Sequence, residues 1–229
     1  DWLPFLLIIF IYENLHDFAI LFSQYDIAPF LYQADLWMFG VSPTLWAQKI
    51  TTPWLTDVMA ILYAPYIAYA MILMAFYTLL GYRPAFKQIS LAVIFTFILG
   101  FICYIVFPAL PPRFYIHDLF TNPPSLNGSA LHDLLQGTWD GLSVNRGAAF
   151  PSLHTALSSV ALFYAFRYRN ERKLFKITFW IYLPLIVGLW SSTIYLRHHW
   201  VLDIFAGWTV AAIACFTSQK ISYWTQRYQ

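Results

Sequence analysis

The chain has 229 residues, of which 60% are hydrophobic and 10% are charged. Soluble domains usually carry about 25% charged residues, so this composition excludes an ordinary water-soluble domain. The net charge is only +2, and the sequence has no basic tail or basic helix, which excludes a nucleic-acid-binding function. Cys103 and Cys215 both lie within apolar runs, where we expect buried small side chains and neither a disulfide nor a metal site.

Apolar runs long enough to cross a bilayer recur along the chain. A spanning helix needs about 20 apolar residues, and an open sheet edge cannot be satisfied in lipid. Six segments are candidates: 2–22, 58–80, 88–107, 148–166, 177–196 and 199–217. We do not read the first as a signal peptide, because no small-residue cleavage site follows it, and the missing methionine suggests a trimmed start. The sequence therefore predicts an all-α polytopic membrane protein, with residues 1–229 forming one bundle of six transmembrane helices.

The positive charges predict the orientation of this bundle. Nine of the 13 lysines and arginines fall on one side of the six-helix arrangement, which the positive-inside rule assigns to the cytoplasm. Long connections at about 23–57 and 108–147 then lie on the non-cytoplasmic side, which is periplasmic or lumenal. Loops of this length are usually functional. Arg113, Arg146 and Arg197 fall on the same side against the charge bias, which indicates a functional site there.

His199 and Asp203 are four residues apart at the start of the sixth predicted helix, so we expect them to share one helix face. A carboxylate beside an imidazole can hold one ring nitrogen protonated and leave the other free to attack a substrate. The alternative is a pair that only satisfies its own hydrogen bonds. An aspartate one turn inside a membrane helix is costly and usually functional, which favours the catalytic interpretation.

His154 lies in the segment 150–154, where Pro151 predicts that the fourth helix begins. The free amides and dipole of a helix start bind anions well, and Ser152 adds a hydroxyl donor. His154 would then lie within one turn of the anion, where it could protonate a leaving oxygen. A packing role for a histidine in an apolar run is the alternative.

Two further sets of polar residues are candidates for binding. Arg113, Arg146 and Arg197 carry guanidinium groups, which match phosphate oxygens and would stabilise the charge that develops during transfer. A second set, in the first predicted helix, is spaced to lie on one side of it and could bind hydroxyls of a head group or an acceptor: Glu13, His16 and Asp17. Its alternative is that this helix ends early and Asp17 reaches water.

The two histidine segments together resemble a known family. Residues 151–154 resemble the P-S-x-H motif of the type 2 phosphatidic acid phosphatase superfamily. Residues 192–203 resemble its S-R-x-x-x-x-x-H-x-x-x-D motif, with the same spacing from serine to histidine to aspartate. The motifs cover about the C-terminal third of the chain, and the six-helix plan extends the resemblance over nearly all of it. The resemblance implies a six-helix fold with an outward-facing, metal-independent site that needs no cofactor.

The resemblance also implies a role for each matching residue. His199 would be the nucleophile that forms a phosphohistidine, and Asp203 would orient it. His154 would be the general acid, and Ser152 would help to hold the phosphate. The reaction would move a phosphate-bearing group between a phospholipid donor and an acceptor, either a lipid alcohol or water.

Departures from the motifs indicate one branch of the superfamily. The motif arginine is Thr193 here, and the family's K-x-x-x-x-x-x-R-P motif is not recognisable, with Arg113 as its expected substitute. Residues 195–199 and Phe150 are instead similar to inositol phosphorylceramide synthases, which transfer a phosphorylated head group in sphingolipid metabolism. A phosphomonoester carries about −1.5 to −2 charge at neutral pH, whereas a phosphodiester carries one negative charge. Losing two cationic positions therefore favours a diester donor.

Three other functions remain open at this point. A lipid phosphate phosphatase acting on phosphatidic acid or a polyprenyl (di)phosphate would use the same residues, with water as acceptor. A metal hydrolase would bind zinc through histidines and an aspartate of the two motifs, namely His154, His198, His199 and Asp203. A lipid transporter without chemistry would line its pathway with intramembrane acids, but the inverted repeats common in transporters are not visible.

Overall fold

The computed structural model describes residues 25–120, 126 and 148–227. Over this part of the chain the regular structure is helical, apart from an isolated parallel bridge between Ala109 and Ala148. The α-helices are α2 (Ala28–Phe39), α3 (Pro43–Ala47), α4 (Pro53–Tyr63), α5 (Tyr66–Leu79), α6 (Arg83–Val106), α7 (Pro112–Tyr115), α9 (Leu153–Arg167), α10 (Lys173–Tyr195) and α11 (Val201–Arg227). Short 3-10 turns η1 (Gln48–Ile50) and η2 (His117–Leu119) complete the described elements. The all-helical prediction is confirmed for these residues.

Several of these helices are long and apolar enough to cross a membrane. Among the described residues, three single helices are long and apolar enough: α6, α10 and the segment Val201–Tyr223 of α11. The pair α4 and α5 adds a fourth if the two helices form one span. The first predicted span, at 2–22, lies outside the described residues, and α9 has only 15 residues. The chain is thus a helical membrane protein in which three or four spans are visible.

The second predicted span, at 58–80, is not one straight helix. It divides into α4 and α5, whose axes differ by 48°. Pro65 lies at the break, and it has no N–H to donate and a ring that clashes with the carbonyl four residues earlier. Pro184 lies within α10, yet that helix remains continuous in the structure. The bend brings the aromatic residues on either side of Pro65 to one end of the bundle.

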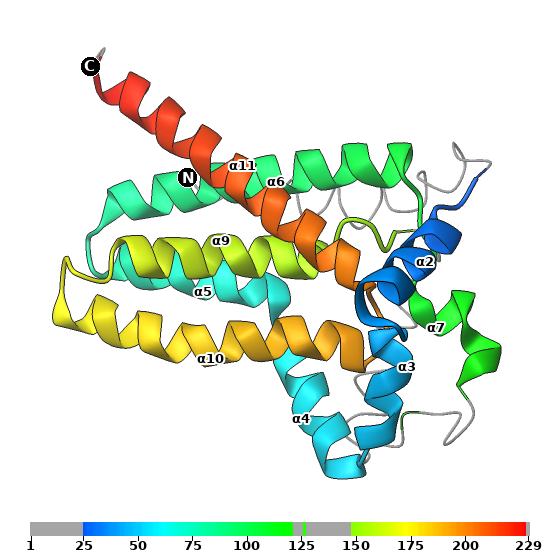
Figure 1. The fold of residues 1–229 in the computed structure, drawn as a ribbon. Helices are drawn as coiled ribbons and strands as arrows, with labels where there is room; N and C mark the ends of the chain where they lie inside the picture. Colours follow the sequence, from blue (N-terminus) through cyan, green and yellow to red (C-terminus); the bar gives the residue numbers. More distant parts are fainter. Residues whose placement is uncertain (1–24, 121–125, 127–147, 228–229) are drawn as a thin grey trace.

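Helix α9 is the centre of the bundle. It packs against α5, α6, α10 and α11, and Figure 1 shows it running between α6 and α10 with α5 behind it. Its buried residues include the small side chains Ala156, Ala161 and Ala165, which allow close approach of neighbouring helices. A residue near the start of α9 is therefore surrounded by other helices on most sides.

The short helices α2, α3 and α7 gather at the end of the bundle where α9 and α11 begin (Figure 1). The connection predicted at 23–57 is thus largely helical. Backbone hydrogen bonds attach this layer to the segment that follows α6: Ile27 N donates to Pro108 O at 2.9 Å, and Ala149 N donates to Ala109 O at 3.0 Å. These contacts form a cover over the starts of α9 and α11.

The opposite end of the bundle carries the connections α5–α6 and α9–α10 and the end of α11 (Figure 1). Arg83, Arg167 and Arg172 lie there, together with other lysines and arginines that the sequence grouped on one side. The layer of short helices and the cationic end are therefore at opposite ends of the described bundle.

Candidate active site

The connection between α10 and α11 sets the position of His199. Its backbone reverses within residues 196–200, where Arg197 has a φ of 65° in the left-handed region. The amides of His198 and His199 donate to the carbonyl of Thr193 at 3.0 and 3.2 Å, which closes the turn. Since α11 begins at Val201, His199 precedes the helix and does not share a helix face with Asp203 as predicted. The two side chains nevertheless meet, because the turn places the imidazole above the first turn of α11.

The hydrogen bonds of His199 fix its protonation pattern. Its Nδ1 lies 2.9 Å from the carbonyl oxygen of Ala149 and 3.2 Å from Asp203 Oδ2. A carbonyl oxygen can only accept, so Nδ1 carries a proton, and in the neutral imidazole Nε2 then keeps its lone pair. Both His199 and Asp203 are buried, at 4% and 0% exposure. The imidazole is thus held in the tautomer and orientation that a nitrogen nucleophile requires.

The free nitrogen of His199 points at the second predicted histidine. His199 Nε2 lies 3.3 Å from His154 Nδ1, although the two residues are 45 positions apart in the chain. His154 lies in the first turn of α9, as the sequence predicted. A group attacked by Nε2 would therefore sit beside an imidazole that can give a proton to the leaving oxygen.

Ser152 joins α9 to α11 at this point. Its side chain is the N-cap of α9 and accepts a hydrogen bond from Thr155 N at 3.2 Å, while its own amide donates to Asp203 O at 3.0 Å. The hydroxyl hydrogen of Ser152 is not used by the cap, so it remains available to an anion. Helix α11 approaches closely here because residue 207 is glycine: a Cβ atom would lie 2.7 Å from Ser152 O.

The structure places two of the three predicted arginines near the histidines. Arg113 N donates to Arg197 O at 3.0 Å, so the backbones of α7 and the α10–α11 turn lie side by side. The charge of Arg113 is within electrostatic range of His154. Arg197 is 5% exposed, and its guanidinium carbon lies 3.9 Å from the centroid of the Phe120 ring. Both arginines therefore occupy the same end of the bundle as the histidine pair.

Thr193 occupies the position of the motif arginine and adds no charge. Its hydroxyl donates to Trp190 O at 2.7 Å, within the same helix, and its side chain is buried. Its carbonyl receives the two amides that close the turn before His199. Thr193 thus has a structural role in the turn.

Tyr63 and Tyr66 were not identified from the sequence. The ring of Tyr63 stacks on His154 and on His198, with centroids 4.4 and 4.5 Å apart and interplanar angles of 20° and 15°. The centroid of the Tyr66 ring lies 3.9 Å from the centroid of the His154 ring. Both tyrosines flank the bend at Pro65, so they line the site because the span is broken. A proline between two tyrosines in an apolar run was the available signal.

Asp35 was also missed. It lies on α2, is fully buried, and its Oδ1 accepts a hydrogen bond from Val201 N at 3.3 Å, at the start of α11. An aspartate that follows Ala28 and Leu31 at helical spacing was the available signal. Four other predicted site residues lie outside the described residues: Glu13, His16, Asp17 and Arg146.

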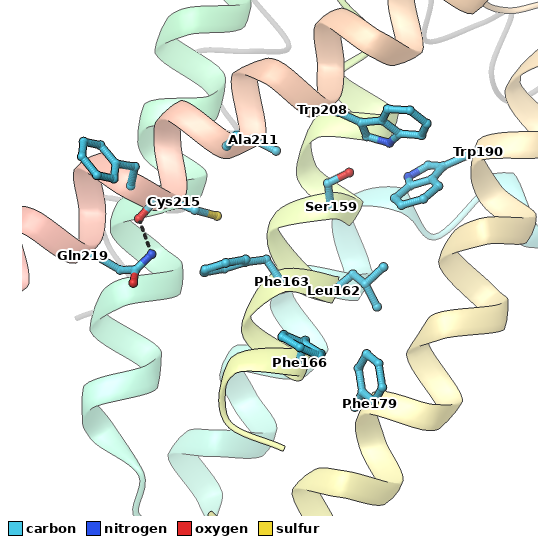
Figure 2. Close-up of a pocket in the computed structure, with 12 residues that line it drawn as sticks. Ser159, Leu162, Phe163, Phe166, Phe179, Trp190, Trp208, Ala211, Cys215 and Gln219 are labelled. Atoms are coloured by element: carbon cyan, nitrogen blue, oxygen red, sulfur yellow. Dashed lines mark hydrogen bonds between the residues drawn. The ribbon is translucent and has the colours of Figure 1, made fainter. Parts of the chain in front are cut away.

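An apolar groove of about 590 Å³ lies on a different face of α9, between α10 and α11. Figure 2 shows the indole rings of Trp190 and Trp208 near one end and Phe166 and Phe179 near the other. No charged residue lines it among the described residues, and its lining includes several exposed aromatic side chains. The groove has the character of a lipid-facing surface and lacks the polar groups of the histidine site.

Comparison with known proteins identifies relatives of the chain. The phosphoinositol dihydroceramide synthase of Bacteroides thetaiotaomicron is 29% identical over 140 residues, covering 57% of this chain and 45% of that protein. The catalytic subunit of inositol phosphorylceramide synthase from Saccharomyces cerevisiae is 32% identical over 139 residues, covering 54% of this chain and 32% of that protein. The chain thus matches less than half the length of either relative. No solved structure matches it significantly.

The family assignment rests on a longer match. The PAP2 superfamily model matches residues 30–217, which include both histidine motifs, the bend at Pro65 and the layer formed by α2, α3 and α7. The resemblance inferred from the two motifs is confirmed, and the similarity to inositol phosphorylceramide synthases is that of the branch indicated by the sequence. The chain belongs to the PAP2 superfamily.

Proposed function

We propose that this protein transfers a phosphorylated head group from a phospholipid to a lipid alcohol, through a phosphohistidine formed on His199. The observation that carries the proposal is the 3.3 Å contact between His199 Nε2 and His154 Nδ1, with His199 Nδ1 bonded to Asp203. The proposed nucleophile lies between its orienting carboxylate, on Nδ1, and the proposed proton donor, on Nε2. His199, Asp203 and His154 are the catalytic residues of the proposal.

The proposed reaction has two steps that use the same residues in opposite order. Nε2 of His199 attacks phosphorus, the bond from phosphorus to the diacylglycerol oxygen breaks, and His154 gives that oxygen its proton. In the second step, an acceptor hydroxyl gives its proton to His154 and attacks phosphorus, and the P–N bond breaks. Asp203 stabilises the imidazolium character of His199 during both steps. Each step leaves the protein ready for the next.

The phosphate-binding residues in this proposal are Ser152, Arg113, Arg197 and Arg146. The start of α9 supplies helix amides and the Ser152 hydroxyl, and arginine forks match phosphate oxygens. Because Thr193 is committed to its own helix, the site has one cation fewer than the family motif would provide. This supports a diester donor with one negative charge over a monoester. Hydrolysis of a lipid phosphate is the competing outcome, in which water replaces the acceptor alcohol.

The names of the relatives suggest the substrates. One is a phosphoinositol dihydroceramide synthase and the other a subunit of inositol phosphorylceramide synthase. We infer that the donor is an inositol phospholipid and that the acceptor is a ceramide-type lipid alcohol. Glu13, His16 and Asp17 are the candidates for contacts with head-group or acceptor hydroxyls.

We further propose that residues 1–229 form one catalytic unit of six transmembrane spans. In this arrangement segment 2–22 and α9 complete the spans visible in the structure, and the α4–α5 pair crosses as one bent span. The site then faces the non-cytoplasmic side, because the lysines and arginines at the opposite end of the bundle follow the positive-inside rule. Labelling of single cysteines placed at Tyr82 and His117 with a membrane-impermeant reagent tests this sidedness.

The first experiment offers the purified protein two labelled substrates in separate reactions. One contains phosphatidic acid, and the other contains phosphatidylinositol with ceramide. A new phosphosphingolipid together with diacylglycerol in the second reaction is the expected result. Free phosphate from the first reaction alone would reject the transferase and identify a phosphatase.

The matched control for this experiment is a histidine outside the site. His117 lies at the surface beside Asp118, and His117→Ala should retain wild-type turnover. His199→Ala should abolish it. Activity that persists in a strong chelator is also expected, since the proposed chemistry uses no metal ion; loss of activity that zinc restores would support the rival metal hydrolase.

A further inference from the structure

The buried face of α2 consists of two apolar residues followed by one aspartate. The buried residues of this helix are Ala28, Leu31 and Asp35, at spacings of three and four that define a single inward stripe. Figure 1 shows α2 lying beside the start of α11. The first two side chains pack in a cluster with Trp200. Asp35 therefore reaches the start of α11 from the layer that covers the site.

Two aspartates from different helices bind consecutive amides at this point. Asp203 Oδ2 accepts from Trp200 N at 2.8 Å, and Asp35 Oδ1 accepts from Val201 N at 3.3 Å. The other oxygen of each carboxyl, Asp35 Oδ2 and Asp203 Oδ1, is buried and has no hydrogen-bond partner among the described residues. Both residues are 0% exposed. Each carboxyl thus uses one oxygen to hold the start of α11 and has the other oxygen available.

Two buried carboxylates in one site cannot both stay ionised at low cost. Asp203 is bonded to His199 Nδ1, which favours the ionised form of Asp203. Among the described residues, Asp35 has no such cationic or imidazole partner in its hydrogen bonds. Burial and the nearby charge of Asp203 raise the pKa of Asp35 to about 7. Other titratable groups on neighbouring elements are His199 before α11 and Arg113 and Tyr115 on α7.

We propose that Asp35 is a positioning residue that carries the single proton of an Asp35–Asp203 pair and thereby keeps Asp203 ionised and aligned with His199. A neutral Asp35 accepts the Val201 amide through Oδ1 and carries its proton on Oδ2, which has no hydrogen-bond partner among the described residues. A charged Asp35 would add a second negative charge beside Asp203 and disturb the orientation of His199. This inference rests on the proposed phosphohistidine chemistry, because Asp35 acts through Asp203.

Two substitutions at Asp35 distinguish an effect of its hydrogen-bonding groups from an effect of the shape of its side chain. Asp35→Asn replaces the neutral acid by an amide of the same size, with one acceptor and one donor. Asp35→Leu keeps the branched side chain of four heavy atoms, is somewhat larger, and removes both the acceptor and the donor. We expect Asp35→Asn to retain kcat within about twofold, and Asp35→Leu to lose roughly tenfold or more in kcat with little change in KM. A wild-type kcat for Asp35→Leu, or an equal loss in both variants, would overturn the inference.

The matched control is the other aspartate of this region. Asp26 is exposed, and its Oδ1 accepts from Ala28 N at 2.9 Å and from Leu110 N at 3.0 Å, away from Asp203. Asp26→Leu should change kcat by less than about twofold, because it removes backbone hydrogen bonds of the same layer without touching the carboxyl pair. A loss of kcat equal to that of Asp35→Leu would indicate a general effect of loosening the layer and would overturn the specific role.

A measurement of thermal stability tests whether Asp35 is protonated in the folded protein, and it does not depend on enzyme turnover. The pKa of Asp35 rises from 3.8 to about 7 on folding, so between these values the folded protein holds a proton that the unfolded chain has lost. Its stabilising effect is complete below the lower value and is lost as pH rises through the upper one. We expect the thermal midpoint of the wild type to fall more steeply than that of Asp35→Asn from pH 5 to about pH 8. Equal slopes would overturn the inference.

The combined results distinguish the two proposals. If the wild type turns over no phospholipid, the proposed function fails, and the thermal midpoints still decide whether Asp35 carries the proton. If the wild type is active and the Asp35 variants match it in kcat and in pH dependence, only the role of Asp35 fails. Infrared difference spectra provide a direct check: a protonated carboxyl band present in the wild type at pH 6 should be absent from Asp35→Asn.

Discussion

Helix α9 presents two faces that differ in almost every respect. One face carries His154, which contacts Tyr63, Tyr66 and His199 beneath the short helices. The other face carries Ser159, Leu162, Phe163 and Phe166, which line the apolar groove (Figure 2). Both faces come from the same run of 15 residues. The comparison teaches that the chemistry depends on what the rest of the fold brings to each face, since the helix itself is apolar around most of its surface.

The two faces also differ in how their groups are satisfied. At the histidine face, hydrogen bonds position the reactive side chain, as with Ala149 O and Asp203 Oδ2 on His199 Nδ1. At the groove, aromatic pairs such as Trp190 with Trp208, 5.2 Å between ring centroids, provide the contacts. Substitutions at the first face should therefore affect activity strongly, and substitutions at the second should affect it weakly.

The largest effect is expected at His199. His199→Ala removes the proposed nucleophile, so turnover should fall to the background of the assay, and no phosphorus should be trapped on the protein in acid- and base-controlled quench experiments. The wild type should yield a base-stable, acid-labile phosphoryl adduct under the same quench. Recovery of that adduct from His199→Ala would remove this residue from the mechanism.

The next largest effect is expected at Asp203. Asp203→Asn keeps the size of the side chain but lets an amide face Nδ1 of His199, which favours the wrong tautomer. We expect kcat to fall by roughly 10²- to 10⁴-fold with a small change in KM. Steady-state kinetics at saturating donor measures this loss. An unchanged kcat would mean that Ala149 O alone orients the imidazole.

A smaller effect is expected at Gly207, where the backbones of α9 and α11 approach closely. A Cβ atom there would lie 2.7 Å from Ser152 O and 3.3 Å from Ala156 N, so Gly207→Ala must push the start of α9 away from α11. Overpacking of this kind typically costs about 1–3 kcal/mol, and we expect roughly tenfold lower kcat as Ser152 and His154 shift.

Gly188→Ala is the control for this experiment. The three atoms nearest to a Cβ atom at Gly188 would all belong to the Leu62 side chain, the nearest at 2.8 Å, and a leucine side chain can rotate away. Its effect on kcat should be smaller than that of Gly207→Ala. An equal loss of kcat in both glycine variants would contradict this prediction. It would mean that the backbone clash at Gly207 affects the site no more than a side-chain clash at Gly188.

The smallest effect is expected in the groove. Phe163 is 36% exposed and lines the apolar groove, which we expect to face lipid. Phe163→Leu should change kcat by less than about twofold, because lipid hydrocarbon can fill the space that the ring leaves. Activity in nanodiscs of defined composition is the suitable measurement. A loss comparable to that of Gly207→Ala would show that the groove takes part in catalysis.

The histidine motifs were visible in the sequence because their residues are close together along the chain. Ser152 and His154 follow a proline at a helix start, and His199 and Asp203 are four residues apart, so local geometry was enough to select them. The position of His199 was wrong in detail: it precedes α11, because the left-handed residue Arg197 and the carbonyl of Thr193 close the turn first. The contact between His199 and Asp203 is still formed, because the turn directs the imidazole toward Asp203.

Residues without a local pattern could not be found in this way. Tyr63 stacks between two histidines that lie far from it in the chain, and it reaches them only because Pro65 bends the span by 48°. Asp35 meets Val201 across 166 positions. Such contacts depend on how helices pack, and the hydrophobic pattern of a membrane helix barely distinguishes one side of it from another.

The sequence by itself determined that this is a helical membrane protein, which superfamily it belongs to and which residues form its two motifs. Length and hydropathy select helices in lipid, and short-range spacing records which residues share a turn. Only the tertiary structure decided that His199 Nε2 lies 3.3 Å from His154 Nδ1, that Tyr63 stacks on His154, and that Asp35 binds the amide of Val201. The physical reason is that a reactive site is assembled from the ends of several helices, and the relative placement of those ends is set by packing and by turns such as 196–200.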